Sequence, residues 1–324
     1  MQHFLKTFLL FVLIHNTSYG QEIALTEIDS FGNNSGNLKM FIHYNSIADS
    51  SNLPLVVVLH GCGETAKSAA ELTGWNKLAD LNNFVVLYPQ QNLLNNPSLC
   101  FNWFNDHDIK KGLGECESIT QMIYFVKEHY SIDSARIFIT GLSAGAAMSV
   151  VMTATHPELF KCGAIFAGGA YKLAENSIDG IKTMRGKKKI STQKLVNNVR
   201  EENPNYTGQY PPLIIYQGIN DPVVDYENSK LLINQWTALF NADTIPDKIE
   251  YSFMGVEDIT RFEYTDSSGQ VIIIFYEVNR LGHRLMINPG ENENEGGQTG
   301  IFGVDKDFHS TYQTALEFGL IKKG

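Results

Sequence analysis

A serine at the centre of the pentapeptide Gly141–Gly145 is the residue of this sequence best suited to nucleophilic chemistry. The β-branched and aromatic run Arg136–Ile139 before it is typical of a buried strand, and Ala146–Met152 after it is typical of a helix. The two glycines permit a sharp turn that lifts the Ser143 hydroxyl beside the helix N-terminus, where backbone N–H groups favour negative charge. Five residues can match such a pattern by accident, but the strand and helix around them predict that Ser143 is the nucleophile of an acyl-transfer reaction.

Two histidines are candidates for the base that a serine hydroxyl needs. In this strand–turn–helix arrangement the chain order is serine, acid, histidine, and only His283 and His309 follow a candidate acid. His283 comes shortly after the last strong predicted strand, where a loop can bring it over the sheet. His309 lies in the predicted closing helix 307–320, which would hold its ring away from that edge. We therefore predict His283 as the base, the alternative being a loop histidine without a catalytic task.

The acid that orients the histidine is expected just after the predicted strand Leu213–Gln217. Two aspartates occur there, Asp221 and Asp225. Asp221 is nearer the strand end, and Pro222 stiffens the loop behind it. Asp225 comes directly before a predicted helix, where an aspartate often forms a turn or caps the helix. The sequence therefore favours Asp221 as the acid.

Two backbone N–H groups must stabilise the oxyanion of the tetrahedral intermediate. One is expected from Ala144, which follows the nucleophile. The other is expected from Cys62, in the loop 60–63 after the buried strand Leu55–Leu59. Small residues in that loop let the backbone approach a substrate carbonyl.

The long polar loop 90–114 carries an aromatic pair and a cysteine. Trp103 and Phe104 are predicted to line an acyl or aryl pocket, although core packing beneath the loop explains two aromatic residues equally well. A bridge from Cys62 to Cys100 would tie the oxyanion loop to this long loop.

The remaining cysteines leave the disulfide pattern open. Four cysteines allow three pairings, and Cys116 and Cys162 either pair with each other or stay reduced. The chain has no Cys-x-x-Cys pair and no His/Cys cluster at zinc spacing, so no metal site is expected. The predicted chemistry also needs no organic cofactor.

Composition and the N-terminus indicate a soluble exported protein. The formal charge is −10, which argues against nucleic acid or an anionic membrane surface as a partner. Residues 1–20 combine a basic start, an apolar run too short to span a bilayer and a small-residue end, as in a secretory signal peptide cleaved before Gln21. The alternative is a buried N-terminal helix. The sequence gives no oligomeric state.

The rest of the chain alternates buried strands with helices. This order predicts one α/β domain over 21–324, with a mostly parallel sheet covered by helices on both faces. A polar stretch, 171–210, interrupts this alternation of strands and helices and is expected to hold one helix near 192–200. A hairpin is expected over 23–44. The other expected helices and strands are helices 65–81, 117–129 and 227–240 and strands 55–59, 84–89, 162–169, 213–218, 249–255, 260–265 and 271–278.

Several ordered motifs resemble those of the poly(3-hydroxybutyrate) depolymerase-like esterase family. They are Pro54–Cys62, Cys100–Phe104, Gly141–Gly145, Gly218–Val224 and Gly282-His283. The resemblance implies an α/β-hydrolase fold, secretion, a Ser143–Asp221–His283 triad, and an oxyanion amide at Cys62, often with a disulfide at that cysteine. The family includes polyhydroxyalkanoate depolymerases, feruloyl esterases and acetylxylan esterases.

Two departures from the family pattern bear on the substrate. Family members often carry an aromatic residue shortly after the catalytic histidine, whereas Arg284–Met286 follows here, and then the acidic, glycine-rich run Glu291–Gly297. No polymer-binding module is recognised after residue 320. We therefore expect a secreted serine esterase acting on feruloyl or acetyl esters of plant polysaccharide, or on hydroxyalkanoate oligomers. The alternatives are a polyhydroxybutyrate depolymerase, a serine peptidase on the same fold, and a non-catalytic glycan-binding protein that keeps the hydrolase scaffold.

Overall fold

A computed structural model describes residues 25–45 and 52–322 of the chain. The predicted signal peptide, residues 1–20, lies outside these described residues. Within them, no helix has both the length and the apolar character needed to cross a bilayer.

One sheet organises the molecule, with strand order β1-β2-β4-β3-β5-β6-β7-β10-β9-β8. From β4 to β10 all neighbouring strands run parallel, while β1, β2, β8 and β9 pair antiparallel at the two ends. This confirms the predicted mostly parallel sheet and the N-terminal hairpin. The strands are β1 (Thr26–Ile28), β2 (Lys39–His43), β3 (Leu53–Leu59), β4 (Val85–Gln90), β5 (Ile132–Leu142), β6 (Cys162–Phe166), β7 (Leu213–Gly218), β8 (Lys248–Glu250), β9 (Ile259–Thr265) and β10 (Val271–Val278).

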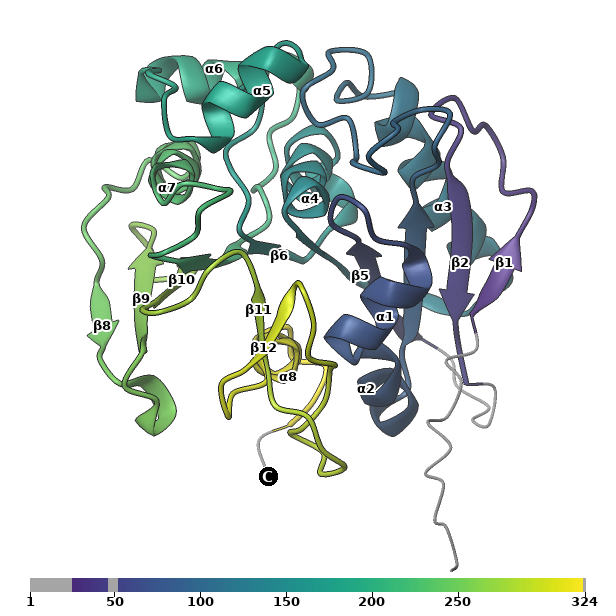
Figure 1. The fold of residues 1–324 in the computed structure, drawn as a ribbon. Coiled ribbons are helices and arrows are strands. Elements are labelled where there is room, and N and C mark those ends of the chain that lie inside the picture. The colour runs from purple at the N-terminus through teal and green to yellow at the C-terminus, as the bar shows by residue number, and fades with distance from the viewer. Residues whose placement is uncertain (1–24, 46–51, 323–324) are drawn as a thin grey trace, which may run out of the picture.

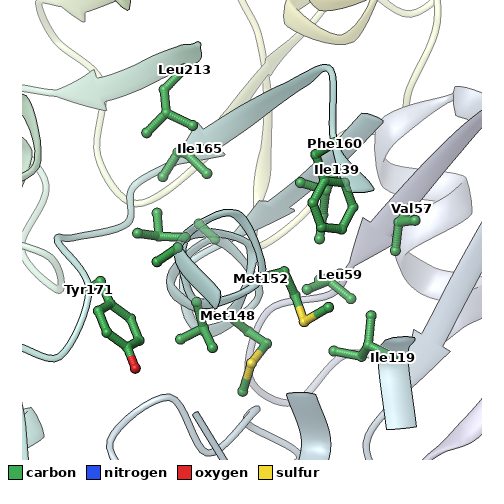
Figure 2. Packing of buried hydrophobic residues seen from close by; sticks show 14 of the residues in the cluster. Val57, Leu59, Ile119, Ile139, Met148, Met152, Phe160, Ile165, Tyr171 and Leu213 are labelled. Carbon is green, nitrogen blue, oxygen red and sulfur yellow. The ribbon is translucent and has the colours of Figure 1, made fainter. Parts of the chain in front are cut away.

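Helices cover both faces of this sheet, as predicted. One layer holds α3 (Gly114–His129), α4 (Ala144–Thr155), α6 (Thr192–Glu202) and α7 (Glu227–Leu239), and the opposite layer holds α1 (Ala66–Thr73), α2 (Trp75–Asn82) and α8 (Ser310–Glu317) (Figure 1). Successive residues of a strand point to opposite faces, so one strand serves two cores. In β3, Val57 and Leu59 join the first core, whereas Val56 and Val58 join the second. Figure 2 shows Leu59 beside Met152 of α4.

Three local expectations were wrong for identifiable reasons. The predicted helix 65–81 is two helices that meet at Gly74, whose φ of 72° breaks the helical path. The predicted strand 249–255 ends at Glu250 in β8, because Ser252 and Met254 both have positive φ and form a short 3₁₀ turn, Phe253–Gly255. The polar stretch 171–210 holds two helices, α5 (Ser177–Met184) and α6.

The C-terminal region contains a small second sheet that the sequence pattern did not reveal. Strand β11 (Leu285–Ile287) pairs in parallel with β12 (Gly303–Asp305). Within the loop between them, Asn288 and Gly296 form an isolated antiparallel β-bridge. The closing helix α8 is shorter than predicted, since His309 is its N-cap residue and does not lie inside it.

Candidate active site

The turn between β5 and α4 holds Ser143 in a conformation that few residues adopt. Its φ and ψ are 57° and −118°, and it is the N-cap residue of α4. Both flanking glycines are needed for packing. A Cβ on Gly145 would lie 2.2 Å from the carbonyl oxygen of Leu59, and a Cβ on Gly141 would lie 2.4 Å from the carbonyl carbon of Gly145. The serine N–H donates to the carbonyl of Phe166 at 2.9 Å, which fixes the strained turn to β6.

Asp221 and His283 form a hydrogen-bonded pair on the loops that follow β7 and β10. The His283 Nδ1–H donates to Asp221 Oδ2 at 2.8 Å. The other carboxylate oxygen, Oδ1, accepts the backbone N–H groups of Val223 and Val224 at 2.8 and 2.9 Å. The aspartate side chain is fully buried, and that of His283 is 9% exposed. A carboxylate held this firmly fixes the imidazole tautomer and leaves Nε2 as the basic nitrogen.

The competing aspartate and histidine are engaged elsewhere. Asp225 Oδ1 accepts the N–H of Glu227 at 2.9 Å just before α7, which is the turn-forming role considered for it above. The ring of His309 is buried, and its Nε2–H donates to the carbonyl of Thr73 at 2.9 Å at the end of α1. Burial lowers the pKa of His309 to about 4, so this ring is neutral near pH 7.

Topology brings the three predicted residues to one edge of the sheet. Strands β5, β7 and β10 belong to the parallel part of the sheet, so their carboxyl ends lie on the same side. Ser143, Asp221 and His283 follow these three ends in turn. Among the described residues, no hydrogen bond joins Ser143 Oγ to His283 Nε2; such contacts are often loose in ligand-free enzymes and tighten with substrate.

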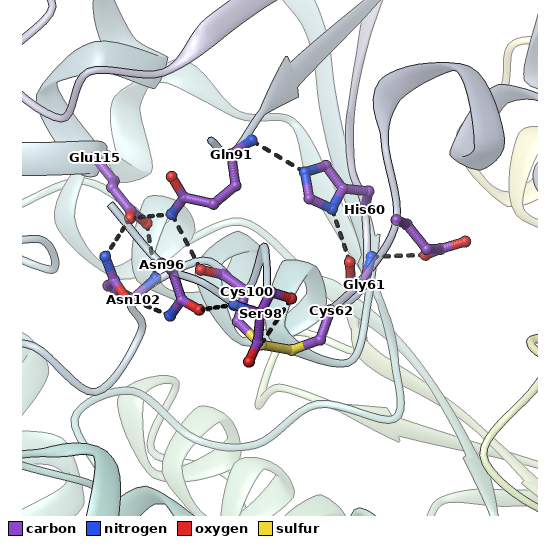
Figure 3. The surroundings of a disulfide bond; sticks show 10 residues. His60, Gly61, Cys62, Gln91, Asn96, Ser98, Cys100, Asn102 and Glu115 are labelled. Carbon is purple, nitrogen blue, oxygen red and sulfur yellow. Dashed lines mark hydrogen bonds between the residues drawn. A yellow bond between two sulfur atoms is a disulfide. The ribbon is translucent and has the colours of Figure 1, made fainter. Parts of the chain in front are cut away.

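The loop after β3 presents the second predicted oxyanion donor. Among the residues that the structure describes, the amide N–H groups of Cys62 and Ala144 donate to no protein acceptor, and both residues line the same pocket as Ser143. The ring of His60 holds this loop in place: Nδ1–H donates to the carbonyl of Gly61 at 2.7 Å, and Nε2 accepts the Gln91 N–H at 3.1 Å (Figure 3). Only a neutral ring can do both, and burial lowers the pKa of His60 to about 4.

A disulfide ties this loop to the long loop between β4 and α3. Cys62 forms a disulfide with Cys100 (Figure 3). The Gly63 N–H also donates to the carbonyl of Ser98 at 2.8 Å. The structure thus contains the bridge considered above. The other two cysteines are unpaired: Cys116 is buried and Cys162 is half-buried.

A buried acid, Glu115 of α3, holds the long loop from beneath. Its carboxyl oxygens accept the backbone N–H of Asn102 at 2.8 Å and the side-chain amides of Asn102 at 2.7 Å and Gln91 at 2.5 Å. Burial, aided by the nearby charge of Asp108, raises the pKa of Glu115 to about 8. Sequence reasoning missed this residue, because a glutamate in the first turn of a helix usually faces solvent.

The pocket beside Ser143 is apolar, and one of the two predicted aromatic residues lines it. Trp103 lines it, whereas Phe104 packs behind, with its ring edge against Trp103 and its side chain against Gly180 of α5. The remaining lining comes from three neighbouring segments that sequence reasoning did not single out. These residues are Ala147, Ala167, Gly168, Gly169, Ala170, Leu173, Thr183, Met184, Val224 and Asn228. Among residues 25–45 and 52–322, no group of three or more His, Cys, Asp or Glu side chains is placed to hold a metal ion.

Residues 40–244 match the family model described as Esterase PHB depolymerase. The chain belongs to that family. It is therefore a carboxylic ester hydrolase, and the predicted resemblance is confirmed.

The relatives of this esterase differ in the substrates that their names give. Poly(3-hydroxyalkanoate) depolymerase C of Paucimonas lemoignei is 37% identical over 298 residues, which cover 92% of this chain and 70% of that protein. Acetylxylan esterase of Coprinopsis cinerea is 32% identical over 228 residues, which cover 68% of this chain and 60% of that relative. The acetyl xylan esterase structure from Aspergillus awamori superposes with a TM-score of 0.77 at 21% identity, over 92% of this chain and 100% of the solved one. The α/β-hydrolase fold is thereby confirmed.

Proposed function

We propose that this esterase acts through a Ser143–His283–Asp221 triad and an acyl-enzyme intermediate. The observation that carries the proposal is the 2.8 Å hydrogen bond from His283 to the buried Asp221, at the same sheet edge as the strained Ser143 turn. An aspartate and a histidine without a catalytic task would not need to be held together at this edge, beside a serine in so rare a backbone conformation.

The proposed reaction follows from these positions. His283 Nε2 takes the hydroxyl proton as Ser143 Oγ attacks the ester carbonyl, and Asp221 stabilises the resulting imidazolium. The amides of Cys62 and Ala144 bind the oxyanion. His283 returns the proton to the leaving alcohol, which departs and leaves the acyl group on Ser143. Water then repeats the sequence with His283 as base and releases the acid.

The pocket supports a short aliphatic acyl group as the preferred substrate. Small residues line it next to the nucleophile, and the bulky side chains of Leu173, Met184 and Val224 also border it. An acetyl or 3-hydroxyalkanoyl group suits such a lining better than an extended aryl group does, although Trp103 offers one aromatic surface. The proposed substrates are therefore hydroxyalkanoate oligomers, with acetylated polysaccharide as the second candidate.

The proposed location is outside the cytoplasm. The predicted signal peptide supports it, and so does the Cys62–Cys100 disulfide, because such bonds persist mainly in oxidising compartments.

An activity panel tests the proposal. The wild-type enzyme and Ser143→Ala are compared on hydroxybutyrate oligomers, acetylated xylan, methyl ferulate and a peptide amide. We expect the oligomers or acetylated xylan to be hydrolysed fastest and the Ser143→Ala variant to lose at least about 10³-fold in kcat with an unchanged circular dichroism spectrum. Full activity of that variant would contradict the triad. Preference for the amide would indicate a peptidase, and wild-type protein that fails to react with a fluorophosphonate would indicate a non-catalytic binding protein.

A further inference from the structure

A second cavity is lined by the histidine of the proposed triad and not by its serine. Ser143 lines the apolar pocket described above, whereas His283 lines a separate, open groove. The loop that carries Asp221 lies between the two, since Val224 borders the pocket and Val223 borders the groove. The pocket encloses about 40 Å³ and the groove about 400 Å³. The larger part of a substrate therefore has room on the histidine side.

Three chain segments build this groove, and backbone hydrogen bonds link them. The Asn220 N–H on the acid loop donates to the carbonyl of Leu281 on the histidine segment at 3.2 Å. The third segment belongs to the small second sheet, where the Leu285 N–H donates to the carbonyl of Phe302 at 2.7 Å. The pairing of β11 with β12 thereby brings the edge of the Phe302 ring to the ring of His283, with ring centroids 6.2 Å apart. The groove is thus held in shape before any ligand binds.

Apolar side chains line the groove and face solvent. Ile301 is 80% exposed and Val223 is 42% exposed, and both line the groove together with Phe302. Single exposed apolar side chains are common on protein surfaces. Two that line one groove beside a base, with an aromatic ring next to them, are suited to an alkyl group of a ligand.

Arg284 supplies a positive charge to the same groove. It follows the histidine directly, is exposed and lines the groove. Within the part of the chain that the structure describes, its guanidinium forms no ion pair and no hydrogen bond. Arg280, which also lines the groove, already pairs with Asp258 at 2.7 Å. Arg284 is therefore available to an anionic group of a ligand, and a guanidinium binds a carboxylate through two parallel hydrogen bonds.

The proton transfer assigns the groove to one half of the ester. His283 Nε2 gives its proton to the ester oxygen that leaves, so this oxygen and the alcohol attached to it lie on the histidine side. The acyl group becomes bonded to Ser143 and stays on the side of the pocket. We propose that the groove is the subsite for the leaving alcohol and selects a hydroxy acid, whose carboxylate pairs with Arg284 and whose alkyl group packs on Ile301 and Phe302.

This proposal rests on the function proposed above and narrows its substrates to esters whose alcohol carries a carboxylate. The last ester bond of a short hydroxyalkanoate oligomer has such an alcohol, because the terminal carboxylate lies a few bonds from the leaving oxygen. Ser143 Oγ forms the new bond to the acyl carbon, the hydroxy acid leaves with the proton from His283, and its carboxylate keeps its charge throughout. An acetylated neutral sugar offers neither an anion for Arg284 nor an alkyl group for the apolar wall.

A pair of acetate esters isolates the leaving alcohol. 3-Acetoxybutyrate and 3-acetoxybutyramide have the same acyl group and alcohols of similar size, but only the first alcohol is charged. We expect wild-type kcat/KM to be about five- to tenfold higher for the carboxylate, and Arg284→Gln to remove most of this ratio through a higher KM, because the ion pair is present in the ground state as well as in the transition state. Arg284→Lys keeps the charge and should retain at least about a third of the ratio. A ratio that Arg284→Gln leaves unchanged would overturn the role of the arginine.

The matched control is Arg200→Gln. This exposed arginine lies on α6 outside the groove, and its loss changes the net charge by the same amount, so the ratio should stay within about twofold of the wild-type value. An equal loss of the ratio in Arg200→Gln would show that the net charge of the protein, and not Arg284, attracts the carboxylate.

Ile301→Asn tests the apolar wall. It should lower the preference for 3-acetoxybutyrate over 3-acetoxypropionate about threefold, because one methyl group loses its apolar contact. An unchanged preference would overturn this contact, and faster hydrolysis of an acetylated uronic acid would overturn the choice of a hydroxy acid. If Ser143→Ala still hydrolyses both acetoxy esters, the proposed function fails; if Ser143 is required and Arg284→Gln leaves the ratio unchanged, only the alcohol subsite fails.

Discussion

The Asp221 carboxylate is held by its own loop before it meets the histidine. The backbone N–H groups of Val223 and Val224 occupy Oδ1, so the short turn that carries the acid also fixes the direction of Oδ2 toward His283. This explains why an acid close to the strand end is suitable. Asp225, four residues further along, already lies at the start of a helix and points its Oδ1 at that helix.

Replacing each aspartate by asparagine in turn should show which of the two is the acid of the triad. Asp221→Asn keeps the size of the side chain but can present an amide N–H to His283, which favours the wrong tautomer. We expect kcat to fall by about 10³- to 10⁴-fold. Asp225→Asn is the control and should keep kcat within about threefold, because the asparagine oxygen can still accept the Glu227 N–H. Steady-state kinetics on p-nitrophenyl acetate distinguishes them, and a larger loss for Asp225→Asn would reassign the acid.

At the residue scale, the sequence allowed a prediction of the triad residues, because the order of nucleophile, acid and base along the chain is constrained. It gave no signal for the pocket residues, whose positions depend on tertiary packing. Ser143, Asp221 and His283 could be selected because strand ends and a fixed order leave few candidates. Met184 and Asn228 reach the pocket only through the fold of the 171–210 stretch and α7, and no local pattern marks them.

At the scale of elements, two loops act as one unit around the oxyanion site. The Cys62–Cys100 bond, the Gly63–Ser98 backbone bond and the ring of His60 link the loop after β3 to the loop after β4. Neither loop has regular secondary structure in this region. Their geometry therefore depends on these cross-links, and the amide of Cys62 depends on that geometry.

Removal of the disulfide should reduce both stability and turnover. For the double variant Cys62→Ser/Cys100→Ser we expect the free energy of unfolding to fall by about 2–4 kcal/mol. We expect kcat to fall by up to about 10²-fold with a smaller change in KM, because one oxyanion donor is loosened. Urea denaturation and steady-state kinetics measure the two effects. The control Cys162→Ala removes an unpaired thiol and should keep kcat; a double variant with wild-type kcat would show that the bond does not position the amide.

Sequence patterns predicted the central strands better than the connections. The run Leu55–Leu59 is apolar on both sides because helices cover both faces of the sheet, so its burial is visible in composition alone. The break at Gly74 was not visible, since residues 65–81 keep one apolar stripe across it. The break is a packing feature: a Cβ on Gly74 would lie 2.8 Å from the backbone nitrogen of Gly297, on the distant C-terminal loop.

At the scale of the whole molecule, neutral histidines are buried at three separate places within the described part of the chain. His60 lies at the start of the oxyanion loop, His156 between α4 and α3, and His309 between α8 and α1. Burial lowers the pKa of each to about 4. Glu115 has the opposite shift, to about 8. These four groups link folding to pH in opposite directions.

The sign for each group follows from proton binding. Between about pH 4 and 6.5 the unfolded chain binds protons at three histidines that the folded chain leaves neutral, so the free energy of unfolding rises with pH. Between pH 4.5 and about 8 the folded chain keeps the Glu115 proton that the unfolded chain loses, so this group lowers the free energy of unfolding as pH rises. Below pH 6.5 the effect of the three histidines on the free energy of unfolding exceeds that of Glu115. Above pH 6.5, Glu115 is the one of these four groups that still changes it.

Stability should therefore be greatest near pH 6.5 and fall on both sides. Each net proton contributes about 1.4 kcal/mol per pH unit where it is fully effective. Urea denaturation at pH 5, 6.5 and 8 measures the free energy of unfolding. Glu115→Gln should flatten the fall between pH 6.5 and 8 and leave the acid side unchanged, whereas His156→Gln should reduce the slope below pH 6.5 alone. An unchanged fall above pH 6.5 in Glu115→Gln would show that the carboxyl is already ionised in the folded chain, and that the three amide N–H donors around it offset its burial.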